Sequence, residues 1–426
     1  MSAQTIFYVI LGIVLSSYLF ERLIDLLEAT RLSPVLPEEL KGLYDEGQYR
    51  EQQAYAKTNL RFKFVSSALD LAFTLLMLLF GGFAWLDMIV RDYTDHPILQ
   101  ALLFFGIFGL AIDLLSTPLT LYKTFVIEAR YGFNKTTWGI FFLDKLKAYF
   151  LAAVLGGGLV ALLVWLWQLT GGYFWLLSWG VVALVLIAIT MFYTSLLPLF
   201  NRLKPVEDET LNEAIRRYAD SVHFQVQNIL EMDGSRRSTK ANAFFSGVGP
   251  RRKIVLFDTL IKKCSYEEIV AVLAHEVGHY KKKHTLTSLI AGVLNVGVIL
   301  FVLSLTLGQP VFAQALGVQE PSFHIGVLVF ALLFAPVSLL TGILMNAKSR
   351  KNEYEADAYA AETFDGETLV SGLKRTSVDA LSNLRPHPLN VFVHYSHPPV
   401  LQRIEAIRRV NERIGKHIPN REAYVS

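Results

Sequence analysis

The chain has 426 residues, of which 53% are hydrophobic and only 18% are charged. Soluble domains carry roughly a quarter charged residues, so this composition excludes an ordinary soluble protein and indicates a membrane protein. The net charge of +3 is too small to suggest a nucleic-acid binder. The single cysteine, Cys264, excludes an intrachain disulfide and a cysteine-rich zinc site. The apolar start lacks a signal-peptide cleavage site, so we expect it to be retained.

Seven apolar stretches are long enough to form membrane helices, which need about 20 residues. They lie near residues 4–20, 64–90, 98–126, 148–170, 173–200, 285–307 and 322–346. Any one of them also fits a buried core helix. Seven in one chain favour a protein that crosses the membrane seven times.

Basic residues divide the connecting loops into two classes. The loops after the first and third stretches and the two long polar segments are rich in Lys and Arg. The loops at 91–97, 171–172 and 308–321 together contain one arginine. Because cytoplasmic loops collect Lys and Arg, we expect an outer N-terminus and both long polar segments on the cytoplasmic side.

These stretches predict four parts of the chain: a five-span region over 1–200, a cytoplasmic α+β protease segment over 201–284, two further spans over 285–346 and a C-terminal segment over 347–426. The predicted fold class is an all-α multi-span membrane protein with a small α+β portion. Within that portion, the pattern predicts a helix from Glu207 to Gln227 and strands at Ala241–Phe245 and Lys253–Phe257.

Ser265 and Glu268 have the spacing of a capping box, which predicts the start of a helix. That helix contains His275 and His279, whose imidazoles project from one face and can share a metal ion. Glu276 lies one position around the helix, where a carboxylate activates a metal-bound water instead of binding the metal. The alternative is a pair of surface histidines on an amphipathic helix, although the sixth span follows directly and leaves little solvated surface.

A catalytic zinc ion takes three protein ligands and keeps a fourth position open. His284 follows His279 without an intervening glycine turn, so we expect it to be a polar residue at the membrane surface and not a ligand. Beyond the last span, Glu353 and Asp357 share a helical face, while Glu355 points elsewhere. Glu353 has the spacing of a ligand and Asp357 that of a residue orienting a ligand histidine. A solvated acidic helix face remains the alternative.

Six segments, in this order and combined with seven spans, resemble the type I CAAX prenyl protease family of integral membrane zinc metalloproteases. They are Arg130-Tyr-Gly-Phe-Asn-Lys135, Asp233-Gly-Ser235, Asn242-Ala-Phe-Phe245, His275-Glu-Val-Gly-His279, Glu353-Tyr-Glu-Ala-Asp357 and His394-Tyr-Ser-His-Pro-Pro399. The resemblance covers nearly the whole chain.

The resemblance implies one zinc ion (Zn2+) per chain and a set of residues around it. The metal ligands fall on His275, His279 and Glu353, with Asp357 behind them. Glu276 is then the general base for a zinc-activated water.

The resemblance also assigns roles to three residues that spacing alone does not single out. His397 corresponds to a catalytic histidine that stabilises the tetrahedral intermediate, and Arg403 to an arginine that holds the substrate. Asn242 corresponds to an asparagine on the strand that binds the peptide backbone. From the residues alone, we would interpret His397 as a turn residue before two prolines and Arg403 as a helix-surface charge.

The family encloses a water-filled chamber within its helices. Intramembrane carboxylates usually face a cavity or a partner, so the chamber accounts for Asp70 and Asp113; a buried structural pair accounts for them equally well. The expected partners are membrane lipid and a peptide or protein substrate, with or without an attached lipid.

The resemblance implies a membrane zinc metalloendopeptidase that cleaves near the C-terminus of CAAX proteins, prenylated or not. The chain ends Arg421-Glu-Ala-Tyr-Val-Ser426 without a retrieval signal, so we expect a bacterial member in the cytoplasmic (inner) membrane with its active site facing the cytoplasm. Bacteria make no prenylated substrates, which leaves the substrate open. One alternative is an HtpX-type quality-control protease, which has the same metal site in a shorter chain with fewer spans. The other is a non-enzymatic transporter or channel, against which the zinc-and-base pattern argues.

Overall fold

The computed structural model describes residues 1–37, 45–246 and 253–415, so the C-terminal segment Arg421–Ser426 lies outside the described residues. The helices of the first part are α1 (Ala3–Ala29), α2 (Glu46–Leu79), α3 (Gly82–Tyr93), α4 (Pro97–Tyr122), α5 (Trp138–Leu151), α6 (Gly157–Thr170) and α7 (Phe174–Leu196). Short π-helical segments continue α4 and α5, namely η2 (Lys123–Glu128) and η3 (Ala152–Gly156). Short 3-10 turns flank α7, namely η4 (Gly171–Tyr173) and η5 (Leu197–Leu199).

The second part contains one small sheet and ten helices among the described residues. Its strands are β1 (Leu203–Pro205), β2 (Asn228–Met232), β3 (Ala243–Ser246) and β4 (Lys253–Phe257), with a 3-10 turn η6 (Gly234–Arg236). Its helices are α8 (Glu209–Ser221), α9 (Asp258–Lys263), α10 (Tyr266–Lys281), α11 (His284–Ser304), α12 (Pro310–Ala315), α13 (Phe323–Leu333), α14 (Ala335–Thr363), α15 (Gly366–Asp379), α16 (Pro388–His394) and α17 (Val400–Gly415).

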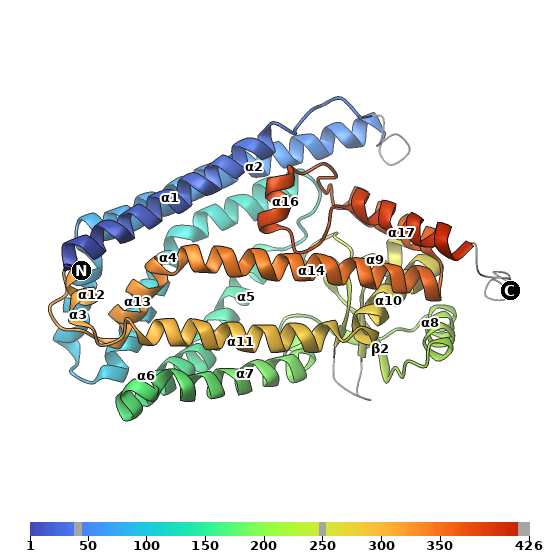
Figure 1. The fold of residues 1–426 in the computed structure, drawn as a ribbon. Coiled ribbons are helices and arrows are strands. Elements are labelled where there is room, and N and C mark those ends of the chain that lie inside the picture. The colour runs from blue at the N-terminus through green and yellow to red at the C-terminus, as the bar shows by residue number, and fades with distance from the viewer. Residues whose placement is uncertain (38–44, 247–252, 416–426) are drawn as a thin grey trace.

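The long helices lie side by side, and the two ends of the molecule differ (Figure 1). The N-terminus, α3 and α12 lie at one end, whereas α8, α10 and α17 lie with the sheet at the other. Helices α11 and α14 run from the first end to the second, where they meet α10. The candidate metal-binding residues of α10 and α14 therefore meet at the end of the helical bundle.

The described residues contain five helical stretches that are long and apolar enough to cross a membrane: Ala3–Ala29, Glu46–Leu79, Pro97–Glu128, Trp138–Phe192 and His284–Ser304. Helices α13 and α14, bent by 61° at a short break, form a sixth if they are taken as one span. These helices expose large apolar side chains, among them Leu114, Leu184 and Leu344. Surface of this kind and extent fits a lipid environment, because soluble proteins rarely expose it.

Two of the predicted spans differ from the observed helices. The apolar stretch 64–90 is interrupted at Gly81, whose φ of +68° is left-handed and is adopted freely only by glycine. Helix α2 ends before this turn, and α3 begins after it. The last stretch, 322–346, is broken between α13 and α14, and α14 continues as far as Thr363. This continuation carries Glu353.

The sheet has the order β1-β2-β4-β3. Strands β2 and β4 are parallel, and the other two pairs are antiparallel. The predicted strand at Lys253–Phe257 coincides with β4, whereas β1 and β2 were not predicted. The predicted helix from Glu207 to Gln227 is the shorter α8. The Asp208 side chain caps its start by accepting a hydrogen bond from the Leu211 amide, and the left-handed His223, with φ of +51°, follows its end.

Candidate metal centre

Helix α10 begins where the sequence predicted. The Ser265 hydroxyl accepts a hydrogen bond from the Glu268 amide, and the Glu268 carboxylate accepts one from the Ser265 amide, which confirms the capping box. The helix then buries His275 together with Ala274 and Val277. Its register is thus set at the N-terminus, and it directs the two histidines of the motif towards α14.

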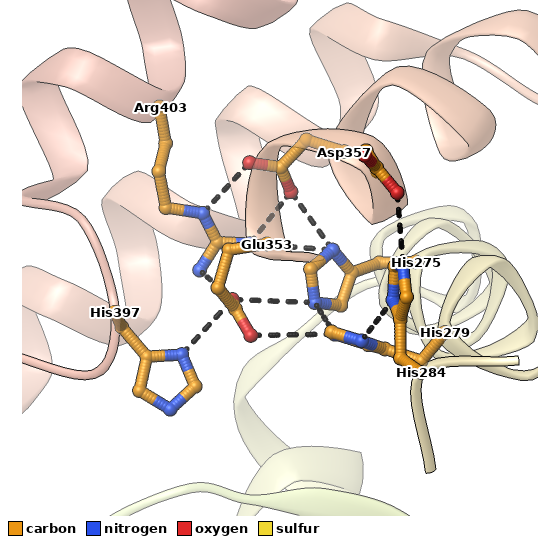
Figure 2. A network of polar contacts seen from close by, with 8 residues as sticks. His275, His279, His284, Glu353, Asp357, His397 and Arg403 are labelled. Atoms are coloured by element: carbon orange, nitrogen blue, oxygen red, sulfur yellow. Dashed lines mark hydrogen bonds and ion pairs between the residues drawn. The ribbon is translucent and has the colours of Figure 1, made fainter. Parts of the chain in front are cut away.

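Helix α14 provides Glu353 as the third member of the cluster. Oε1 of Glu353 lies 3.3 Å from Nε2 of His279, and Oε2 of Glu353 lies 3.6 Å from Nε2 of His275. The two histidine Nε2 atoms are 3.1 Å apart. One potential ligand atom from each residue lies within 4.8 Å of the other two. Figure 2 shows all three side chains converging on one point.

The residues of this cluster fit a metal ion. The Glu353 carboxylate is buried, and its Oε2 lies 2.9 Å from Nδ1 of His397 and 3.4 Å from Arg403. Two imidazole nitrogens and one carboxylate oxygen form the usual donor set of a catalytic zinc site with an open position. Burial disfavours the charge on Glu353, but His279, His397 and Arg403 outweigh burial and lower its pKa, so the carboxylate is ionised.

His275 is oriented by a charged pair behind it. Its Nδ1 lies 2.8 Å from Oδ1 of Asp357, and Arg403 donates two hydrogen bonds to the same carboxylate, of 2.8 and 2.6 Å. Burial opposes the Asp357 charge, but Arg403 outweighs it and lowers the pKa of Asp357. With Nδ1–H donated to Asp357, the lone pair of His275 Nε2 faces the cluster.

Two further side chains flank the cluster. Glu276 is half-buried and forms no hydrogen bond or ion pair with any described residue, and burial raises its pKa. His397 lies with Nδ1 2.9 Å from Oε2 of Glu353, and its side chain is 66% exposed. The hydrogen bond to Glu353 raises the pKa of His397. An acid–base carboxyl and an accessible, readily protonated imidazole thus lie beside the candidate metal position.

Comparison with known proteins agrees with this geometry. The family model for "CAAX prenyl protease N-terminal, five membrane helices" matches residues 26–202, and that for "Peptidase family M48" matches residues 205–411. A CAAX prenyl protease 1 homolog from Arabidopsis thaliana is 32% identical, with 93% of this chain and 96% of that protein covered. The chain belongs to the CAAX prenyl protease family. It is therefore an integral membrane metalloprotease.

Other members of the family are similar over almost the full length. CAAX prenyl protease 1 from Saccharomyces cerevisiae is 30% identical, with 93% of each chain covered. A crystal structure of S. mikatae Ste24p superposes with a TM-score of 0.90 at 29% identity, covering 94% of this chain and 99% of that one. These relatives are eukaryotic, so they give no support to the expected bacterial origin.

The family residues Asn242 and Arg403 lie in different surroundings. Asn242 is exposed and immediately precedes β3, one of the two edge strands of the described sheet, and its Oδ1 accepts a hydrogen bond from the Ala243 amide. Arg403 is buried and, besides its bonds to Asp357, lies 3.4 Å from Oε2 of Glu353. Arg403 therefore contacts the carboxylates of both Asp357 and Glu353 directly.

His284 differs from its sequence prediction. It is buried, with 5% of its surface exposed, and is not a polar residue at the membrane surface. Its Nδ1 lies 3.0 Å from Nδ1 of His279, and its Nε2 lies 3.0 Å from Oε2 of Glu355. Glu355, predicted to point away from the site, is thus connected to it through His284. The sequence does show a histidine five residues after His279, but the spacing rules for metal ligands gave it no role at the site.

The two intramembrane aspartates do not pair with each other among the described residues. Asp113 on α4 lies 2.5 Å from Nζ of Lys145 on α5 and also accepts a hydrogen bond from Tyr149. Asp70 on α2 is exposed, and no described residue forms an ion pair with it. Asp113 therefore joins α4 to α5, and the two carboxylates have separate surroundings.

Proposed function

We propose that the protein holds one zinc ion per chain on His275, His279 and Glu353 and hydrolyses peptide bonds as an endopeptidase. The supporting observation is the convergence of three ligand atoms within 4.8 Å. The donor set of two imidazole nitrogens and one carboxylate oxygen adds to it, because this is a usual set for a catalytic zinc site.

Each neighbouring residue then has a chemical role. When bound, zinc polarises the scissile carbonyl and lowers the pKa of a water ligand. Glu276 accepts a proton from the attacking water and delivers it to the leaving amine, and the raised pKa of Glu276 suits both steps. His397, exposed and hydrogen-bonded to Glu353, donates a hydrogen bond to the oxyanion that develops on the substrate. Asp357 keeps His275 in the ligating tautomer.

We place the substrate along β3. This strand forms an edge of the sheet among the described residues, and Asn242 immediately precedes it. An extended peptide that adds to such an edge is held through its backbone, and the exposed Asn242 side chain supplies further hydrogen bonds. Arg403 acts on the bound peptide through the carboxylates of Asp357 and Glu353, with which it is in contact.

We propose that the substrates are the C-terminal segments of CAAX proteins, with or without a prenyl group. The relatives named CAAX prenyl protease 1 support this class. The position of the site at the end of the helical bundle also favours substrates held at a membrane. The purified protein is tested on a farnesylated C-terminal peptide and on the same peptide without the lipid. Cleavage of either peptide near its C-terminus supports the proposal, and cleavage of neither contradicts it. A strong preference for the farnesylated peptide shows that the prenyl group is recognised, whereas equal cleavage shows that it is not required, as in the HtpX-type alternative.

We further propose seven membrane crossings, with the metal centre on the cytoplasmic side. The stretch Trp138–Phe192 is too long for one span and contains the turn η4 at Gly171–Tyr173, which fits two crossings. The bent pair α13–α14 then supplies the seventh. The excess of Lys and Arg in the polar segments supports the cytoplasmic placement.

The variant Glu276→Gln tests the mechanism. It removes the general base without removing a metal ligand, so we expect at least a 100-fold loss of peptide cleavage, within the usual range for general base catalysis, with stoichiometric zinc retained. Metal analysis and peptide cleavage are measured on the same preparation. Cleavage by the variant at the parent rate would exclude Glu276 as the base.

A further inference from the structure

The two candidate histidine ligands are supported in different ways. His275 meets the Asp357 carboxylate directly, whereas Nδ1 of His279 meets another imidazole, that of His284. His284 in turn meets the carboxylate of Glu355. We propose that His284 and Glu355 are positioning residues that hold His279 for metal binding. This inference rests on the ligand set proposed above.

One arrangement of protons satisfies every atom in this chain of hydrogen bonds. An ionised Glu355 can only accept, so His284 donates its Nε2–H to Glu355 and accepts at Nδ1. His279 then donates its Nδ1–H to His284. The lone pair of His279 Nε2 is left facing Glu353 and His275, at 3.3 and 3.1 Å. The opposite tautomer of His279 would direct an N–H into the metal position.

The burial of His284 also supports its role as a positioning residue for His279. Only 5% of its surface is exposed, so both ring nitrogens need partners within the protein. The two partners that it has are His279 and Glu355. Glu355, by contrast, is 40% exposed at its side chain and lies 3.8 Å from Lys351. The chain of hydrogen bonds thus runs from the ligand, through a buried imidazole, to a carboxylate at the surface.

The backbone between α10 and α11 brings His284 to this place. Lys283 adopts a left-handed conformation, with φ of +59°, which residues other than glycine rarely adopt. The turn is closed by a 2.9 Å hydrogen bond from the Lys283 amide to the Tyr280 carbonyl, and His284 is the first residue of α11. Uncommon backbone of this kind persists where surrounding contacts hold it. The bonds of His284 to His279 and Glu355 are such contacts.

The arrangement connects three helices at the metal position. His279 belongs to α10, His284 to the membrane helix α11 and Glu355 to α14, which also carries Glu353. The orientation of His279 therefore depends on how α11 and α14 pack at the end of the bundle. Outer partners of metal-binding histidines change metal affinity by about 10- to 100-fold when they are removed.

Zinc affinity of the full-length purified protein tests the proposal, measured by competition with a chelator. We expect His284→Ala to bind zinc about 10- to 100-fold more weakly and Glu355→Gln to be weakened less. The double variant is expected to match His284→Ala alone, because Glu355 acts through His284. Glu362→Gln, on the exposed part of the same helix α14, is the matched control and keeps the parent affinity.

A spectroscopic measurement separates positioning from general stability. In the cobalt-substituted protein, we expect the visible absorption bands of the metal to shift in His284→Ala and not in Glu362→Gln. His284→Gln partly restores the parent spectrum, because an amide can accept from His279 and donate to Glu355. Parent-like affinity in Glu355→Gln and His284→Ala, or additive losses in the double variant, would overturn the proposal. If His284→Ala fails to fold, the exposed Glu355→Gln decides alone.

The variant His279→Ala distinguishes this inference from the ligand set itself. Loss of stoichiometric zinc in His279→Ala together with parent-like affinity in His284→Ala rejects the positioning role and leaves the ligand set intact. Stoichiometric zinc in His279→Ala rejects the ligand set, and the positioning role with it.

Discussion

At the scale of single residues, spacing located the centre but not its surroundings. The four-residue spacing of His275 and His279, and that of Glu353 and Asp357, placed all four side chains on the faces that now meet. Spacing along one helix gave no information about His284 and Glu355, because His284 meets His279 across a left-handed turn at Lys283 and meets Glu355 on another helix. Lysine gives no sequence signal for that backbone conformation.

Asp357→Asn tests the support of His275. The change removes the charge that the buried Arg403 contacts most closely, and it leaves Arg403 only the longer, 3.4 Å contact to Glu353. We expect zinc affinity to fall by about 10- to 100-fold and the free energy of unfolding to fall by about 3–5 kcal/mol. Chelator competition and thermal unfolding measure the two effects. Glu362→Gln is the control on the same helix, and parent values for Asp357→Asn in both assays would contradict the assigned role.

At the scale of elements, the centre depends on how closely α10 approaches α14. A Cβ added to Gly278 would lie 3.0 Å from the Cα and O atoms of Ala356 and 3.1 Å from Cβ of Tyr359. Gly278 directly precedes His279, and Ala356 directly precedes Asp357. The sequence motif contains this glycine, but its role is visible only once the partner helix is known.

Gly278→Ala therefore tests the helix contact through the metal. In an open helix, alanine would be favoured over glycine by roughly 0.5–1 kcal/mol, but here the backbone of Ala356 has to move away. We expect weaker zinc binding and a lower unfolding temperature, although Gly278 binds no metal. Gly372→Ala in α15 is the control, since its added Cβ meets its nearest neighbour at an ordinary 3.7 Å. Tighter zinc binding together with a higher unfolding temperature in Gly278→Ala would show that the close contact between α10 and α14 limits neither property.

The lowered pKa of Glu268 predicts how the stability of the start of α10 changes with pH. Burial opposes the charge of Glu268, but hydrogen bonds from Ser371 and the Ser265 amide, with Arg375, outweigh burial and lower its pKa below 4.5. A lowered pKa stabilises the folded protein above the unfolded-state pKa, and this stabilisation is lost as the pH falls through the folded-state pKa. The difference in unfolding free energy between the parent and Glu268→Gln is thus expected to be largest near neutral pH and to shrink below about pH 4. A difference that grows as the pH falls would contradict this assignment.

At the scale of the whole molecule, hydropathy located the helices but not their breaks. Hydropathy along the run 64–90 does not mark the break between α2 and α3, although the Gly81-Gly82 pair is a turn signal. Strand β1 was missed because it has only three residues, and β2 was missed because its sequence Asn-Ile-Leu-Glu-Met neither alternates strictly nor forms a continuous apolar run. The long continuation of α14 beyond its apolar part was also invisible to hydropathy, yet it carries Glu353 and Glu355 to the site.

The number of crossings determines on which side each end of the chain lies. Seven crossings place Ser2, ahead of α1, and Glu405, on α17, on opposite sides of the membrane, whereas six would place them on the same side. Gly172, between α6 and α7, separates the two models further, because it is an outer turn only if Trp138–Phe192 crosses twice.

Single cysteines at these three positions test the count in a Cys264→Ser background, which removes the one native thiol. All three residues are exposed, so the substitutions disturb no core packing. In sealed right-side-out vesicles, we expect a membrane-impermeant thiol reagent to label Ser2→Cys and Gly172→Cys, and to label Glu405→Cys only after the membrane is permeabilised. Labelling of Ser2→Cys and Glu405→Cys from the same side would require an even number of crossings. Such labelling would also place the metal centre on the same side of the membrane as the N-terminus, because α17 packs beside the α14 segment that carries Glu353.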